Sequence, residues 1–114
     1  MKTALFVFNG DPMCFIHVLL NALDLHVHGH EARIVMEGAS VTLPSALVKP
    51  EHPLSRLFAE ARGKGLLEGA CMACSVKLGV AVENEKAGVP LIGDMSGHPS
   101  MASYLEAGWQ VITF

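Results

Sequence analysis

Hydrophobic positions follow two patterns that alternate along the chain. Short, mainly apolar runs, typical of buried strands, occupy residues 4–8, 32–36, 66–70, 89–92 and 109–114. Between these runs, apolar residues recur three or four positions apart, which predicts helices over 12–28, 54–62, 71–79 and 100–107. Asp11 is expected to cap the first of these helices, because Pro12 follows it at the first helical position.

Strands that alternate with helices favour a parallel sheet, since parallel neighbours need long crossover connections. We therefore expect one domain over residues 1–114. Its predicted fold is a three-layer α/β/α sandwich of flavodoxin-like or Rossmann-like type, with a five-stranded, mainly parallel sheet. Two segments lack a clear period. Residues 41–53 contain three prolines and are predicted to be a loop or one short helix, and residues 80–88 are predicted to be a polar connection.

Composition narrows the classes of partner. The net charge is only −3 and no basic run occurs, so we expect no nucleic-acid partner. No apolar stretch reaches the roughly 20 residues that a membrane helix needs, so no membrane partner is expected. The first residues run straight into a strand without a small-residue cleavage site, which favours a cytoplasmic location.

The apolar fraction is high for such a short chain. Of the 114 residues, 51% are hydrophobic and 17% are charged, which is more apolar surface than a small monomeric core readily hides. The natural place for the surplus is segment 41–53, with Val41, Leu43, Leu47 and Val48. Because soluble monomers avoid large exposed apolar patches, we expect this segment to form an interface in a homo-oligomer.

Cys71 and Cys74 carry the strongest chemical signal. Three cysteines do not form a disulfide framework, so reduced or reactive thiols are expected. Cys71 is predicted at an exposed helix N-terminus, which favours a thiolate with a pKa below that of a free thiol and faster alkylation than Cys14. Cys74 follows about one helical turn later, so its sulfur can reach that of Cys71. This pair supplies only two of the four ligands of an ordinary zinc site, and we expect no resident metal or cofactor.

Further candidates lie in loops after the predicted strands. In parallel sheets, ligands bind beyond the carboxyl ends of the strands, at the switch point of the strand order. His98 is expected there as a base near the thiols, whereas Glu37 is expected only to bond loop amides. The supporting candidates that share this edge are Asn9, Asp11, Cys14, Asp94 and His98.

Several short motifs occur in an order that resembles that of a known protein family. Cys71 ends the third strand, and Gly79 follows it at i+8 with a hydrophobic residue after it. The other motifs are the Asn9-Gly10-Asp11 loop, the Gly29-His30-Glu31-Ala32 entry to the second strand, the Glu37-Gly38 turn and the terminal aromatic residue. Together they make the chain similar to the DsrE/DsrF-like sulfur-relay family. The resemblance implies a small domain that assembles into trimers or hexamers, and a persulfide-carrying cysteine in the sulfur-transferring members.

Only Cys71 matches the sulfur-carrying position of that family. The second thiol, Cys74, and the late Gly-Asp-Met-Ser-Gly-His loop depart from its pattern. We therefore expect a sulfur-relay protein with a sulfur-donor or acceptor protein as partner, and sulfurtransferase-like activity stays open. Two alternatives remain. One is a dithiol redox or metal-binding module that uses Cys71, Cys74 and His98, and the other is a non-catalytic oligomeric binding protein in which the cysteines only pack.

Overall fold

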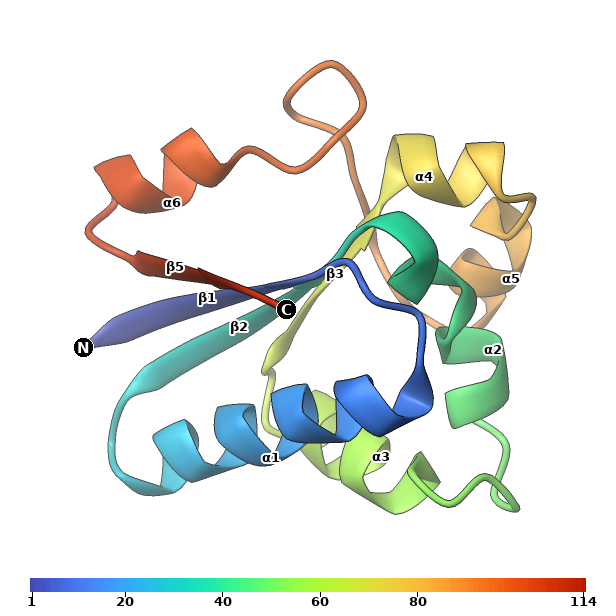
Figure 1. Ribbon diagram of the computed structural model, residues 1–114, viewed down its shortest axis with the longest axis horizontal. Helices are drawn as coiled ribbons and strands as arrows, with labels where there is room; N and C mark the ends of the chain where they lie inside the picture. Colours follow the sequence, from blue (N-terminus) through green and yellow to red (C-terminus); the bar gives the residue numbers. More distant parts are fainter.

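Five parallel strands form the centre of the structure, a computed structural model that describes residues 1–114 (Figure 1). Their order across the sheet is β4-β3-β2-β1-β5. The strands are β1 (Lys2–Val7), β2 (Glu31–Met36), β3 (Leu67–Cys71), β4 (Leu91–Ile92) and β5 (Gln110–Thr113). The expected α/β/α fold is confirmed, and every strand pair is parallel.

Helices cover both faces of this sheet. They are α1 (Pro12–Val27), the 3₁₀ helix η1 (Gly38–Thr42), α2 (Pro44–Leu47), α3 (Ser55–Gly63), α4 (Met72–Lys77), α5 (Ala81–Lys86) and α6 (Met101–Glu106). In Figure 1, α1 and α3 lie on one side of the sheet and α6 on the other, while α2, α4 and α5 gather beyond the carboxyl ends of the strands. None of these helices is long and apolar enough to cross a membrane.

The two faces of β1 explain why its sequence is a continuous apolar run. Leu5 and Val7 belong to the larger core, which includes Phe15 of α1 and Phe58 of α3. The alternate residues Ala4 and Phe6 belong to a smaller core on the α6 side, where the Phe6 ring meets that of Tyr104 edge to face at 5.6 Å. Since both faces of the strand are buried, apolar residues predominate on both.

Residues 80–88 differ from the sequence expectation in secondary structure, whereas residues 41–53 contain the short helix that was one of the two expectations and differ only in their role. Residues 80–88 contain helix α5 rather than only a connection, and residues 41–53 contain the end of η1 and the whole of α2. Val41, Leu43 and Leu47 are buried in the core of their own chain, so segment 41–53 does not supply the exposed apolar interface that its composition suggested. Val48 alone of its four apolar candidates is exposed.

Asn84 ties α5 to its neighbours. Its buried side-chain amide donates hydrogen bonds to the carbonyl of Val41, at 3.0 Å, and to the hydroxyl of Ser75 in α4, at 3.1 Å. One polar side chain thus holds α4, α5 and η1 together. Helix α5 has no periodic apolar pattern in the sequence, because its buried contact is made by a polar side chain.

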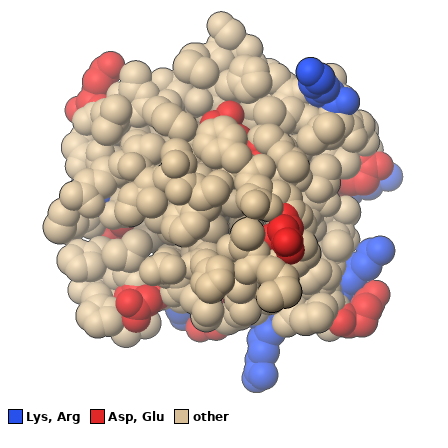
Figure 2. Space-filling model, in the orientation of Figure 1, with Lys and Arg blue, Asp and Glu red and all other residues tan.

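Charged side chains are scattered over the face of the molecule that Figure 2 shows. Figure 2 shows Lys and Arg only around the edge of the visible face, with most of the centre formed by uncharged residues.

Candidate functional site

Four side chains meet at the carboxyl ends of three neighbouring strands. They are Cys71 at the end of β3, Cys74 in α4, Glu37 after β2 and His98 in the loop after β4. One potential ligand atom from each lies within 4.8 Å of those of the other three. We call this set the cysteine cluster. It brings together two sulfur atoms, one imidazole nitrogen and one carboxylate oxygen.

Cys71 is the most enclosed member. It is fully buried and forms the N-cap of α4, where its sulfur accepts the backbone N–H of Cys74 at 3.3 Å. Its Sγ lies 3.2 Å from Nδ1 of His98, and the Sγ of Cys74 lies 4.0 Å from the same nitrogen. Both thiols therefore face one imidazole, which agrees with the expectation of a dithiol pair near a base.

A tight turn holds His98 in place. Met95 and His98 exchange two backbone hydrogen bonds, of 2.7 and 2.9 Å, so the chain reverses between them. Both central residues, Ser96 and Gly97, have positive φ angles, of 50° and 89°, which is the conformation of a type I′ turn. Glycine at position 97 removes the steric cost of that conformation. The imidazole is thus positioned by backbone geometry, while 42% of its side-chain surface stays accessible.

Glu37 completes the cluster from β2. Its backbone N–H donates to the carbonyl of Val7 at 2.7 Å, and its carboxylate Oε1 lies 3.7 Å from Nδ1 of His98. The residue is 93% buried. Sequence reasoning placed Glu37 at the correct edge but gave it no part in the site. The missing signal was the strand order, because β2 and β3 are neighbours only in the folded sheet.

Burial dominates the electrostatics of the cluster. Removal from water raises the pKa of the Cys71 thiol to about 11, and the hydrogen bond from the Cys74 N–H offsets this only in part. Burial also raises the pKa of the Glu37 carboxyl, against the lowering effect of His98. The expectation of an exposed, low-pKa thiolate at Cys71 is therefore wrong, because the sulfur lies inside the core and a helix start does not outweigh its desolvation.

The other supporting candidates have structural contacts instead. The carboxylate of Asp11 accepts the N–H of Met13 and caps α1, as expected, and the Asn9 side chain accepts the N–H of Asp11. Asp94 accepts the N–H of Ser100 at 3.2 Å. Cys14 lies in α1, half-buried and outside the cluster. Among the supporting candidates, only His98 joins the two thiols.

The cluster also lies away from the switch point of the strand order. The chain progresses from β1 through β2 and β3 to β4, and then returns to place β5 on the free side of β1. The order thus reverses between β1 and β5, whereas the cluster stands at β2, β3 and β4. The site was correctly expected at the carboxyl ends of the strands. Its expected position at the switch point, between β1 and β5, is wrong.

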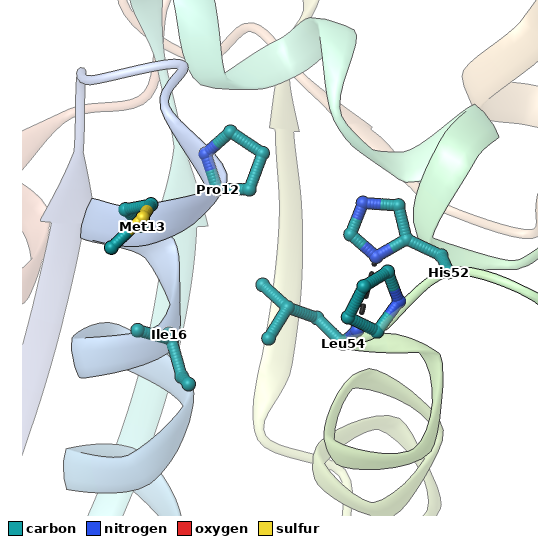
Figure 3. Close-up of a pocket in the computed structure, with 6 residues that line it drawn as sticks. Pro12, Met13, Ile16, His52 and Leu54 are labelled. Carbon is teal, nitrogen blue, oxygen red and sulfur yellow. Dashed lines mark hydrogen bonds between the residues drawn. The ribbon is translucent and has the colours of Figure 1, made fainter.

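Two surface cavities lie apart from the four residues. An apolar cavity of about 430 Å³ is formed by the start of α1 and the segment before α3, with Met13, Ile16 and Leu54 in its wall (Figure 3). A second cavity, of about 500 Å³, is formed beside α6 by residues that include Tyr104 and Trp109. Neither contains a member of the cysteine cluster.

Comparison with solved structures supports the fold. A protein of unknown function from Bacteroides thetaiotaomicron superposes with a TM-score of 0.70 at 20% sequence identity, over 99% of this chain and 94% of the other. At that identity the likeness concerns the fold alone. No protein-family model matches the sequence.

Two archaeal proteins are similar in sequence. An uncharacterized protein from Archaeoglobus fulgidus is 40% identical over 43 residues, which are 38% of this chain and 70% of the relative. An uncharacterized protein from Methanocaldococcus jannaschii is 30% identical over 118 aligned positions, covering 98% of this chain and 94% of the relative. The match spans nearly the whole of both proteins, and the chain therefore belongs to the same family as this Methanocaldococcus protein.

Proposed function

We propose that this protein is a sulfur-relay protein that carries sulfane sulfur as a persulfide on Cys71. The observation that supports this best is the 3.2 Å contact between the Cys71 sulfur and Nδ1 of His98. A buried thiol needs a base to become a nucleophile, and an imidazole in direct contact can take its proton. The resemblance to DsrE/DsrF-like proteins, in which the matching cysteine carries sulfur, points to the same chemistry.

The transfer step is a thiol–persulfide exchange. The Cys71 thiol gives its proton to His98, and the resulting thiolate attacks the outer sulfur of a donor persulfide. The new S–S bond forms on Cys71 while the donor S–S bond breaks, and the donor leaves as a thiolate. Attack by an acceptor thiolate on the outer sulfur of the Cys71 persulfide then passes that sulfur on and restores the Cys71 thiolate.

Cys74 supports a second route, dithiol chemistry. Its sulfur faces the same His98 nitrogen at 4.0 Å. A Cys74 thiolate can attack the inner sulfur of the Cys71 persulfide, which forms the Cys71–Cys74 disulfide and releases hydrosulfide. A dithiol reductant is then needed to restore both thiols. All three cysteines are free in the structure, and we propose a reducing compartment, the cytoplasm, as the place of this chemistry.

Exposure of the reduced, metal-free chain to a small sulfane-sulfur donor tests the proposal. Peptide mass spectrometry should show a gain of one sulfur atom on Cys71, and Cys74→Ser should increase the yield of this persulfide because it blocks disulfide formation. Cys14→Ser is the matched control and should leave the yield unchanged. A wild-type chain and a Cys74→Ser chain that both stay free of added sulfur would contradict the sulfur-relay function.

A further inference from the structure

The geometry of the cysteine cluster suits a ligand other than sulfur. The four donor atoms gather beyond the ends of three adjacent strands, and no two of them are more than 4.8 Å apart. Bonds of about 2.0–2.3 Å to a tetrahedral zinc ion place neighbouring ligand atoms about 3.3–3.8 Å apart. In the structure, His98 Nδ1 lies 3.2 Å from one sulfur, 4.0 Å from the other and 3.7 Å from the Glu37 oxygen. These three separations bracket the edge lengths of such a tetrahedron.

The chemical types of the donors point in the same direction. Two thiols, one imidazole and one carboxylate are the groups that bind Zn²⁺ in proteins. Three of the four become anions when they lose a proton, and the fourth, the His98 imidazole, lies 3.7 Å from the Glu37 carboxylate. Once those protons are lost, the largely enclosed set carries negative charge that a divalent cation would balance.

The surroundings hold the donors in position before any ion binds. The Cys74 N–H bonds the sulfur of Cys71, and the tight turn fixes His98. Hydrogen bonds of this kind orient the ligands of a metal site. The half-exposed imidazole provides a side from which an ion can enter.

We propose that the cysteine cluster binds one Zn²⁺ ion in tetrahedral coordination, through two thiolate sulfurs, one imidazole nitrogen and one carboxylate oxygen. The bound ion engages the lone pairs of both sulfurs. Zinc binding and sulfur transfer are therefore mutually exclusive at this site. This exclusion rests on the proposed function, whereas zinc binding itself rests only on the geometry.

Zinc affinity is measured on the full chain, reduced and stripped of metal, by competition with a chromophoric chelator. One Zn²⁺ per chain should bind with a Kd of about 10⁻⁷ M or tighter. Cys74→Ser and His98→Gln alter partly exposed side chains, and each should weaken binding by about 100-fold or more. Cys14→Ser, outside the cluster, should bind as the wild type does. Absent binding, or affinity that neither variant changes, would overturn the zinc site.

Cobalt provides a second readout that does not depend on affinity. Co²⁺ in place of Zn²⁺ should give thiolate-to-metal charge-transfer absorption, and Cys74→Ser should lower its intensity because one sulfur ligand is lost. Cys14→Ser should leave the spectrum unchanged. An absorption spectrum without any thiolate contribution would count against coordination by the cysteines.

A zinc-loaded chain treated with the sulfane-sulfur donor tests the exclusion. It should gain far less sulfur on Cys71 than the metal-free chain, and a chelator should restore the gain. If zinc binds but the metal-free chain takes up no sulfur, the sulfur-relay function fails and the metal site stands. If sulfur is taken up but zinc does not bind, the metal site fails instead. Equal sulfur uptake with and without bound zinc would overturn the exclusion.

Discussion

Ala73 donates its backbone N–H to the carbonyl of Gly97 at 2.8 Å, across 24 positions of sequence. This bond ties the start of α4, which Cys71 caps and which contains Cys74, to the turn that carries His98. A Cβ atom at position 97 would lie 3.3 Å from the Cβ of Ala73, and the φ angle of Gly97 is +89°. The pairing of thiols and imidazole thus depends on a position where glycine is favoured.

Gly97→Ala should therefore disturb the site as well as the fold. We expect a loss of about 1 kcal/mol in the free energy of unfolding, from strain at positive φ, and weaker zinc binding because His98 shifts. Urea denaturation and chelator competition measure the two effects. Gly29→Ala is the control, since Gly29 has a φ of +83° at the far end of α1, with open space around its missing Cβ. It should lose stability but keep zinc affinity. Equal zinc affinity in both variants would show that the turn does not position His98.

The buried thiol of Cys71 should make the metal-free protein sensitive to alkaline pH. Its pKa is raised from 9.0 to about 11 by burial, so the folded state holds this proton more tightly than the unfolded state. The stability that this provides is complete below about pH 9 and is lost as the pH rises through about 11. Denaturation at a series of pH values should show this loss, and Cys71→Ala should remove it. A wild-type slope that matches the variant slope would contradict the burial effect.

The rate at which Cys71 is alkylated should also reflect the burial of its thiol. At neutral pH, Cys71 should react more slowly than Cys14, which is only half-buried, and its rate should rise steeply toward pH 11. This order is the reverse of the one expected from a helix N-terminus alone. Mass spectrometry of the alkylated peptides measures both rates in one sample. Faster alkylation of Cys71 at neutral pH would show that its sulfur is accessible and ionised.

Asn84 should matter more for stability than any other polar residue of α5. Asn84→Ala removes two buried hydrogen bonds and leaves the Val41 carbonyl without this donor, which should cost about 1–3 kcal/mol. Glu85→Ala, an exposed change on the same helix, is the control and should change stability by less than about 0.5 kcal/mol. Denaturant titration compares them, and equal stability of the two variants would exclude the anchoring role.

Assembly into a homo-oligomer stays a prediction, but the expected interface is now a surface other than segment 41–53. Exposed apolar side chains lie on α4, on α5 and in the turn between them, namely Met72, Val76, Leu78 and Val82. We expect light scattering to show a trimer or hexamer, as the resemblance implies, and Val76→Glu to dissociate it. Val27→Glu, at a still more exposed site at the end of α1, should leave it intact. A particle with the mass of one chain at micromolar concentration would contradict this prediction.

The apolar pattern was sufficient to predict the fold class. Continuous apolar runs such as residues 4–8 predict strands that are buried on both faces, and β1 contributes to both cores. Asp11 and Pro12 predict the start of α1, because capping is a local interaction that needs no tertiary partner. The pattern failed for α5, where the buried contact comes from the amide of Asn84 rather than from an apolar stripe.

The sequence by itself determined the strands, the first helix and the two thiols one turn apart, because these depend on neighbours along the chain. Only the tertiary structure decided that Glu37 stands beside the thiols, since the parallel register pairs Met36 with Ala70 and so brings the next residue of each strand together. The folded core likewise decided the state of Cys71. A helix N-terminus favours the thiolate, but burial, which no local pattern encodes, raises the pKa of its thiol instead.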